Sequence, residues 1–433
     1  MDWDWADARQ PLSVITFFAI SPRSMVVLQR SLLSLGFIPE LFIEYVDENG
    51  RAHWRHCPTR PTMTPLTDAE LDEVTSEVLR DFPNYGQGMI FGALVSEGLR
   101  VSRERVDVSR LRVQGPPPPF RQRTVARNSY RVPGANSVWH HDGNHNLIRW
   151  KIVLHLFVDG CSWAATGIRA HNNNQPMSVL RLFLDSLLHW GTPSRCRGDC
   201  GLENLFVAQW MENYRGVIRN SYIWGRSVHN TRVERMWRDT TVAFSNKWKD
   251  FFYDLERSHS LNLLLNRHIW LLHFLFLGKI NGDCQKWANH WNNHKLSLRG
   301  RSASPLQIWM ESQLLHGARG LEHLTPDDPR VAAPLAAVPN MGLNDEMLSQ
   351  LRARQRVRIH APESVPRSLA YVPCDPPNNP FSQQEFHNFR MRLKAITPDT
   401  DSRMEYQMLR WIHGLSIMSS ILAAHGTPIP ADL

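Results

Sequence analysis

The 433-residue sequence predicts an α/β (α+β) domain with a mixed sheet, preceded by a small all-helical region. Residues 131–312 run as three strands, a helix, a fourth strand and further helices, an order typical of a sheet covered by helices. Residues 67–113 show helical periodicity instead. The 16 Trp and 18 Phe supply a large apolar core and exclude a disordered chain, and 12 of the Trp fall within residues 131–312.

The chain divides into five segments of different character. Residues 1–66 have no assigned role, although Asn49-Gly50 predicts a β-hairpin because both residues tolerate positive φ. The neighbouring His53, His56 and Cys57 are candidate metal ligands, but no second cysteine pair completes a site. Residues 313–433 form a tail or a small appended region, with short helical patterns at 345–356 and 404–424.

Residues 67–113 predict three helices. Thr67 and Glu70 form a capping box for the first, and the second spans residues 87–97. After a turn at Gly98, Ser102 caps a third, basic helix that carries Arg103, Arg105, Arg110 and Arg112. This layout is typical of a helix-turn-helix, whose last helix enters the major groove of DNA. The alternative is a three-helix packing unit with a solvated charged face.

The positive charge of the chain is concentrated beside this region. The whole sequence carries a net charge of +8. Eight Arg and only two acids lie between Arg103 and Arg131, and this stretch includes the Pro-rich basic linker at residues 114–130. Such a cluster is the electrostatic feature expected of a protein that contacts phosphates.

Residues 131–312 hold the best-defined elements. The pattern predicts strands at 137–142, 152–159, 163–170 and 194–198, and helices at 176–190, 204–214 and 231–253. The apolar stretch 261–278 contains Asn262, Arg267 and His273, which are costly in hydrocarbon, so we expect a buried helix and no membrane span.

Three acids lie where a sheet-based domain binds ligands. Asp142 ends the first strand, Asp199 follows the fourth, and Glu234 lies early in a helix. Converging carboxylates suit hard Mg²⁺ or Mn²⁺ ions, and a pair of such ions suits phosphodiester chemistry. Alternatively, Asp199 caps a turn, Glu234 pairs with Arg238, and Asp142 is a surface acid.

The stretch from about Arg131 to Trp309 resembles the integrase core shared by retroviral integrases and bacterial insertion-sequence transposases. It is similar in particular to uncharacterised integrase-core proteins of fungal and animal genomes. The resemblance rests on several motifs in the right order: Tyr130 to Trp150 around Trp139-His-His-Asp142-Gly143, Gly191-Thr-Pro-Ser-Arg195, Gly198-Asp-Cys-Gly-Leu-Glu-Asn204, Gly225 to Asp239, Trp291 to Leu296, and Ser304 to Trp309. The family's spacing of its second and third acids, roughly 35 residues, is met by the 34 residues between Asp199 and Glu234.

The resemblance implies a ribonuclease-H-like integrase core with a mixed five-stranded sheet flanked by helices. It also implies that Asp142, Asp199 and Glu234 are catalytic and bind two Mg²⁺ (or Mn²⁺) ions. The run from Tyr85 to Val106 is similar to the helix-turn-helix just upstream of the core in insertion-sequence transposases. We expect DNA contacts from the arginines of this helix and of the helix that carries Glu234, namely Arg103, Arg105, Arg110, Arg235 and Arg238.

The sequence departs from the family pattern at several positions. Trp163 replaces a usual Arg, Gly198 replaces Ser or Thr beside Asp199, and Thr241 is not basic. The His-His-Cys-Cys zinc domain of retroviral integrases is absent. These departures bear on efficiency more than on identity.

Other conspicuous residues are interpreted as structural. We expect His140, His141 and His145 to make hydrogen bonds rather than touch metal or phosphate, and Cys196 and Cys200 to pack rather than bind zinc. Glu203 could assist the metal site but is expected to cap or pair locally. We expect core positions for Trp210, Trp224, Trp237, Trp248 and Trp270 rather than base stacking.

The leading hypothesis is a DDE-type, transposon-derived enzyme that cleaves DNA and transfers strands. The alternative is a catalytically silent, domesticated DNA-binding remnant of a transposase, and a third possibility is a ribonuclease acting on RNA–DNA hybrids. The expected partner is DNA, bound by a homo-oligomer, with no membrane and no small-molecule cofactor. We expect an intracellular, nuclear protein without a signal peptide.

Overall fold

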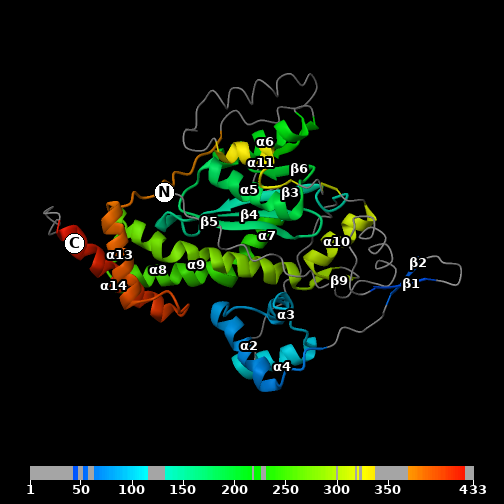
Figure 1. Ribbon diagram of the computed structural model, residues 1–433, viewed down its shortest axis with the longest axis horizontal. Coiled ribbons are helices and arrows are strands. Elements are labelled where there is room, and N and C mark those ends of the chain that lie inside the picture. Colours follow the sequence, from blue (N-terminus) through cyan, green and yellow to red (C-terminus); the bar gives the residue numbers. More distant parts are fainter. Residues whose placement is uncertain are drawn as a thin grey trace.

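A five-stranded mixed sheet forms the centre of the computed structural model (Figure 1). The structure describes residues 42–46, 52–56, 63–115, 132–216, 219–225, 231–298, 301–316, 319–320, 324–336 and 369–424. The strand order is β5-β4-β3-β6-β7, with β3 (Val138–Asn144), β4 (Val153–Asp159), β5 (Ala165–His171), β6 (Arg195–Gly198) and β7 (Tyr222–Trp224). β3, β4 and β5 form an antiparallel meander, whereas β6 pairs in parallel with both β3 and β7. The predicted mixed five-stranded sheet is confirmed and is consistent with a ribonuclease-H-like core.

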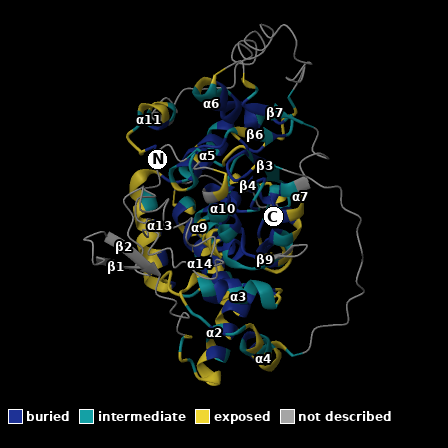
Figure 2. Ribbon diagram, turned by 90° about the vertical axis from the view of Figure 1, so that its right-hand side faces the viewer, coloured by how far each residue is buried: buried dark blue, intermediate teal, exposed yellow. Residues whose placement is uncertain are grey.

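Helices cover both faces of this sheet. α5 (Pro176–Trp190) and α6 (Leu205–Arg215) lie on one face, and α7 (Thr231–Thr240), α8 (Asn246–Ser258) and α9 (Asn266–Asn293) lie on the other (Figure 1). β4 is buried along its whole length because its two faces belong to different hydrophobic clusters. Leu154, Leu156 and Val158 join the cluster of α8 and α9, and Phe157 joins that of α5 and α6. The two clusters appear as the dark central zone of Figure 2.

The helices after the sheet differ from the sequence prediction in detail. The predicted helix 231–253 continues to Ser258 and contains a π-helical segment, Thr241–Ser245, between α7 and α8. The predicted helix 261–278 instead begins at Asn266 and continues to Asn293. Asn262 lies in a turn, where its side chain accepts from the Leu264 N–H (2.8 Å). The continuation buries Trp287 and Trp291, which join the cluster of α8 and α9.

Three helices precede the sheet, as predicted: α2 (Asp68–Asp81), α3 (Gln87–Ser96) and α4 (Arg103–Gln114). The Thr67–Glu70 capping box is present at the start of α2. α3 packs directly against α9: a Cβ atom at Gly92 would overlap the carbonyl oxygen of His290, so glycine is needed at this crossing. The helical unit is therefore docked on the core rather than linked to it only through the chain.

The C-terminal part also belongs to the folded body. A hairpin of β8 (Leu296–Leu298) and β9 (Arg301–Ala303) leads to α10 (Pro305–Leu315) and α11 (Pro329–Ala336). The predicted 404–424 helix is present as α14 (Met404–Ala423), and a helix that the sequence reading missed, α13 (Gln383–Ile396), pairs with it. α14 packs on α9, and the Trp411 Nε1–H donates to the His259 carbonyl (2.8 Å).

Some predictions fall outside the described residues or concern absences. The expected hairpin near the N-terminus is present as two antiparallel strands, β1 (Phe42–Val46) and β2 (Ala52–His56). Four predicted features lie outside the described residues: the Asn49-Gly50 turn, Cys57, most of the linker 114–130 and the helix 345–356. In the described parts of the chain, no helix is long and apolar enough to cross a membrane.

Candidate functional site

Asp142 lies within β3, two residues before the strand ends at Asn144, and Asp199 directly follows the neighbouring parallel strand β6. The register of β3 and β6 pairs Val138 with Arg195 and His140 with Arg197. Continued by two residues, the same register places Asp142 beside Asp199, one residue past the end of β6. Parallel strands end at the same edge of a sheet, which is where ligands bind in open sheets. The two aspartates therefore share this edge.

The third acid reaches the same edge on α7. The Trp237 Nε1–H donates a hydrogen bond to Asp142 Oδ2 (3.1 Å), which ties α7 to β3. Glu234 lies one turn before Trp237 on this helix and is exposed. The pKa of Asp142 is raised to about 7, chiefly by burial and additionally by the negative charges of Asp199 and Glu234. The three carboxylates therefore form one electrostatic site.

The Asp199 carboxylate is oriented by its own turn. Its Oδ1 accepts hydrogen bonds from the Asn204 Nδ2–H (2.7 Å) and from the Gly201 N–H (3.2 Å). These bonds agree with the alternative interpretation, in which Asp199 caps a turn. The same bonds hold this carboxylate at the edge of the sheet beside Asp142.

The three carboxylates are of the chemical kind that binds a divalent cation, but they are not close enough together to hold one. In the described residues, no three His, Cys, Asp or Glu side chains lie close enough together to hold a metal ion. Carboxylates are the ligands that Mg²⁺ and Mn²⁺ prefer. His145 Nε2 is buried and has no hydrogen-bond partner among the residues that the structure describes. Burial lowers the pKa of His145, and the nearby negative charge of Asp199 partly offsets this effect. A complete site requires the exposed Glu234 side chain to turn inward.

Comparison with known proteins identifies the domain that carries these acids. Residues 129–320 match the family model described as the integrase core domain. The chain contains an integrase core domain. No curated protein matches the sequence.

A further acid of the integrase core, Glu203, lies close to this site, although the sequence predicted only a local role for it. Glu203 is only 5% exposed, and its carboxylate folds back over Gly201, where a Cβ atom would overlap it. The pKa of Glu203 is raised to about 7, chiefly by burial and additionally by the charges of Asp199 and Asp142. The sequence signal for a place of Glu203 near the site was its position close to Asp199, in the run Gly198-Asp-Cys-Gly-Leu-Glu-Asn204.

The unusual Gly198 has a physical explanation. A Cβ atom at this position would overlap the Tyr222 hydroxyl oxygen. That hydroxyl shares a hydrogen bond with His141 Nε2 (2.8 Å), and the His141 ring stacks on Phe157 at a centroid distance of 4.6 Å. The Tyr222–His141 pair thus fills the space that a Ser or Thr side chain would need. The expected hydrogen-bonding role of His141 is confirmed.

Trp163, which replaces the family's usual arginine, contacts an arginine of α7. The Arg232 guanidinium lies 3.8 Å from the Trp163 ring centroid, a cation–π contact two residues before Glu234. The Trp163 carbonyl accepts from the Trp291 Nε1–H (2.8 Å), which ties this turn to α9. This pair anchors the start of α7.

The other predicted packing roles are largely observed. Trp210, Trp237 and Trp248 are buried in the core, and Cys196 is buried. The sequence predicted only a core position for Trp237. Its hydrogen bond to Asp142 gives it a second role, at the site.

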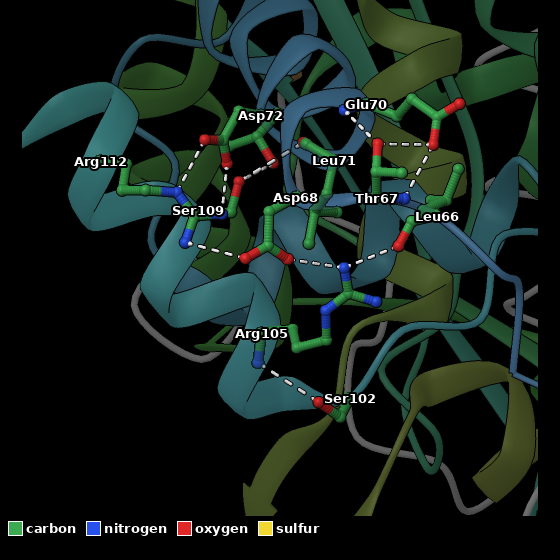
Figure 3. A network of polar contacts seen from close by, with 11 residues as sticks. Leu66, Thr67, Asp68, Glu70, Leu71, Asp72, Ser102, Arg105, Ser109 and Arg112 are labelled. Carbon is green, nitrogen blue, oxygen red and sulfur yellow. Dashed lines mark hydrogen bonds and ion pairs between the residues drawn. The ribbon is translucent and has the colours of Figure 1, made fainter.

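Several predicted DNA-binding arginines are engaged within the helical unit (Figure 3). Arg105 Nη2 donates to Asp68 Oδ1 and to the Leu66 carbonyl, both at 2.7 Å, and Arg112 forms a two-pronged ion pair with Asp72. The contacts of Arg105 and Arg112 hold α4 on α2. Arg110 lies 3.6 Å from Asp107 of its own helix. Arg103, Arg235 and Arg238 are exposed, and Arg235 Nε lies 3.4 Å from Asp239 Oδ2 on the same helix.

Proposed function

We propose that this protein cuts DNA and transfers DNA strands with divalent metal ions, at the edge of the sheet where β3 and β6 end. The proposal assigns catalysis and metal binding to Asp142, Asp199 and Glu234. The observation that carries it is the parallel register of β3 and β6, which aligns the two aspartates, together with the Trp237 bond that brings α7 to Asp142. An integrase core domain supports this class of polynucleotidyl transfer.

The residues of this edge have separable tasks in the proposed reaction. Two divalent ions, when bound, supply activation of the attacking oxygen and stabilisation of the leaving oxygen of a phosphodiester. Asn204 orients Asp199, and Trp237 orients Asp142, so the two carboxylates are fixed before substrate arrives. Glu234 is the exposed member of the three.

We propose DNA as the partner, held by the basic surface near this edge. The exposed Arg235 and Arg238 share α7 with Glu234, and Arg103 is exposed at the start of α4. Contact of Arg105 and Arg110 with DNA stays a prediction, and it competes with the ion pairs that these two residues already make. Action as a homo-oligomer in the nucleus belongs to the same proposal.

The direct test uses the purified full chain, supercoiled plasmid DNA, and Mg²⁺ or Mn²⁺. We expect metal-dependent nicking, and we expect Asp142→Asn and Glu234→Gln to lower its rate at least about a hundredfold, or about 2.7 kcal/mol of barrier. The matched control is Asp185→Asn, which removes an exposed carboxylate of α5 that pairs with Arg169. Nicking that survives either substitution at the site contradicts the assignment.

A second candidate function is DNA binding without catalysis, as in a domesticated remnant. The observation that favours it is the lack, in the described part of the chain, of three ligands already within reach of one ion. Salt-sensitive DNA binding without carboxylate-dependent Mn²⁺ binding would support this candidate. Cleavage of RNA–DNA hybrids in preference to duplex DNA would instead indicate a ribonuclease.

A further inference from the structure

The orientation of Asp199 depends on the shape of the turn that follows β6. Both hydrogen bonds to its Oδ1 come from residues of this turn, Gly201 and Asn204. A change in the backbone at residues 200–204 therefore moves the donors that aim the carboxylate. Whatever holds this backbone contributes to the geometry of the proposed site.

A segment far along the chain pairs with this turn. The Ala370 N–H donates to the Cys200 carbonyl and the Leu202 N–H donates to the Ala370 carbonyl, both at 2.8 Å. Together the bonds form a parallel bridge between Ala370 and Gly201. Leu369 packs against the hydrophobic cluster of α5 and α6. Ala370, which lies outside the matched 129–320 region, thus forms hydrogen bonds with the backbone on both sides of Gly201.

A buried amide joins the same segment to the sheet. Asn174 is 1% exposed, and its N–H donates to the Cys374 carbonyl (3.1 Å) while its Nδ2–H donates to the Val372 carbonyl (3.4 Å). The same side chain contacts Glu203 Oε2 (3.4 Å) and His155 Nε2 (3.0 Å). Asn174 therefore connects the distant segment, the turn after Asp199 and β4.

We propose that residues 369–374 are a positioning segment of the active site, which holds the Asp199 turn through Ala370 and through Asn174. The inference rests on the proposed function for its effect on catalysis, but not for its effect on the turn. Asn174 and Ala370 are positioning residues, because they act through the turn rather than on substrate.

The rest of the C-terminal part is anchored elsewhere, so this contact can be broken separately. Trp411 donates to the His259 carbonyl, and Lys279 pairs with Asp399 (2.6 Å). Trp270 of α9 meets Phe381 edge-on at a centroid distance of 5.3 Å. These contacts fix α13 and α14 on α9 without involving residues 369–374.

The experiment compares full-length variants in hydrogen exchange and in plasmid nicking with Mn²⁺. Ala370→Pro removes the N–H that bonds to Cys200, and Asn174→Ala removes the side-chain connection by a different route. The matched control is Gln383→Pro, a proline at the exposed first position of α13, where proline is tolerated. Thermal unfolding of each variant establishes that the fold is retained.

We expect amides of residues 199–205 to exchange about fivefold faster in Ala370→Pro and Asn174→Ala, because hydrogen bonds that hold the turn are lost. In a nicking-competent protein, kcat falls by a similar factor while KM for DNA is unchanged, and Gln383→Pro alters neither. Wild-type exchange in both variants overturns the inference, as does faster exchange with unchanged kcat. If the wild type does not nick DNA, the proposed function fails, and the exchange result still decides whether the segment holds the turn.

Discussion

At the scale of single residues, unusual side chains beside the proposed catalytic acids are explained by what they touch. Gly198 makes room for the Tyr222–His141 hydrogen bond, which lies in the sheet directly beneath the Asp199 turn. The family resemblance marked Gly198 as a weak point because it lacks a Ser or Thr side chain. The compensation comes from a tyrosine of β7, a strand that the sequence reading did not predict.

This compensation predicts coupling between the two positions. Gly198→Ala should destabilise the fold by about 1–3 kcal/mol, because the new Cβ overlaps the tyrosine hydroxyl in a packed core. Tyr222→Phe should lower the free energy of unfolding by about 1–2 kcal/mol, because its buried hydrogen bond to His141 is lost. The double variant should lose less than the sum, since phenylalanine frees the space. A double-mutant cycle of urea unfolding measures this coupling, and strict additivity would contradict it.

The raised pKa of Asp142 predicts a pH dependence of metal binding. The pKa is about 7, so below this pH an ion must displace a proton. Mn²⁺ affinity should therefore fall by up to about tenfold per pH unit below 7 and level off above it. The stability of the metal-free protein should change in the opposite direction. The folded state holds the Asp142 proton more tightly than the unfolded state does, so the free energy of unfolding should fall as pH rises toward 7.

Calorimetric titration with Mn²⁺ at a series of pH values checks this dependence. Asp142→Asn is the informative variant, because it should abolish the pH-dependent binding and remove the metal-free protein's loss of stability as pH rises toward 7. A Mn²⁺ affinity that is independent of pH in the wild type would show that Asp142 is not a ligand.

At the scale of elements, two helices that look alike in sequence have different environments. α4 and α7 both carry several arginines, but Arg105 and Arg112 of α4 pair with acids of α2, whereas Arg235 and Arg238 of α7 are exposed. The exposed face of α4 includes the apolar Val108 and Leu111. Spacing along the sequence does not reveal this difference, because it depends on Asp68 and Asp72 in another helix.

The two sets of arginines should therefore respond differently to substitution. Replacing Arg235 and Arg238 with alanine should lower the salt dependence of DNA binding, reducing the log–log slope by about 2. Replacing Arg105 and Arg112 should instead destabilise the helical unit slightly, since solvent screens these surface pairs. DNA-binding titrations across salt concentrations, with unfolding curves of the same proteins, separate the effects. A larger slope change from Arg105 and Arg112 would favour the helix-turn-helix reading.

At the scale of the whole molecule, the sequence predicted what is local and missed what depends on distant contacts. The first four strands of the sheet and the Thr67 capping box follow from periodicity and motif. The three-residue β7, the burial of Glu203 and the pairing of Ala370 with the Asp199 turn do not, because each depends on residues from remote parts of the chain. The C-terminal part was read as a tail because its helices are separated by proline-rich stretches.

This arrangement predicts that the matched 129–320 region is not stable alone. α14 covers α9, with Trp411 and Met418 fully buried in the shared cluster. Removing residues 369–433 should expose this surface and destabilise the protein by several kcal/mol, at about 25 cal/mol per Å² of apolar surface. Thermal unfolding and light scattering of the shortened chain check this, and an unchanged Tm with a monomeric species would contradict it.

The central claim is that Asp142, Asp199 and Glu234 bind metal ions at one edge of the sheet. The most direct measurement is anomalous diffraction from crystals of the full chain grown with Mn²⁺. The account predicts anomalous density between the ends of β3 and β6, within about 2.0–2.6 Å of carboxylate oxygens of Asp142 and Asp199, with Glu234 turned inward. Manganese bound elsewhere, with these three side chains left unligated in crystals of a nicking-competent protein, would contradict it.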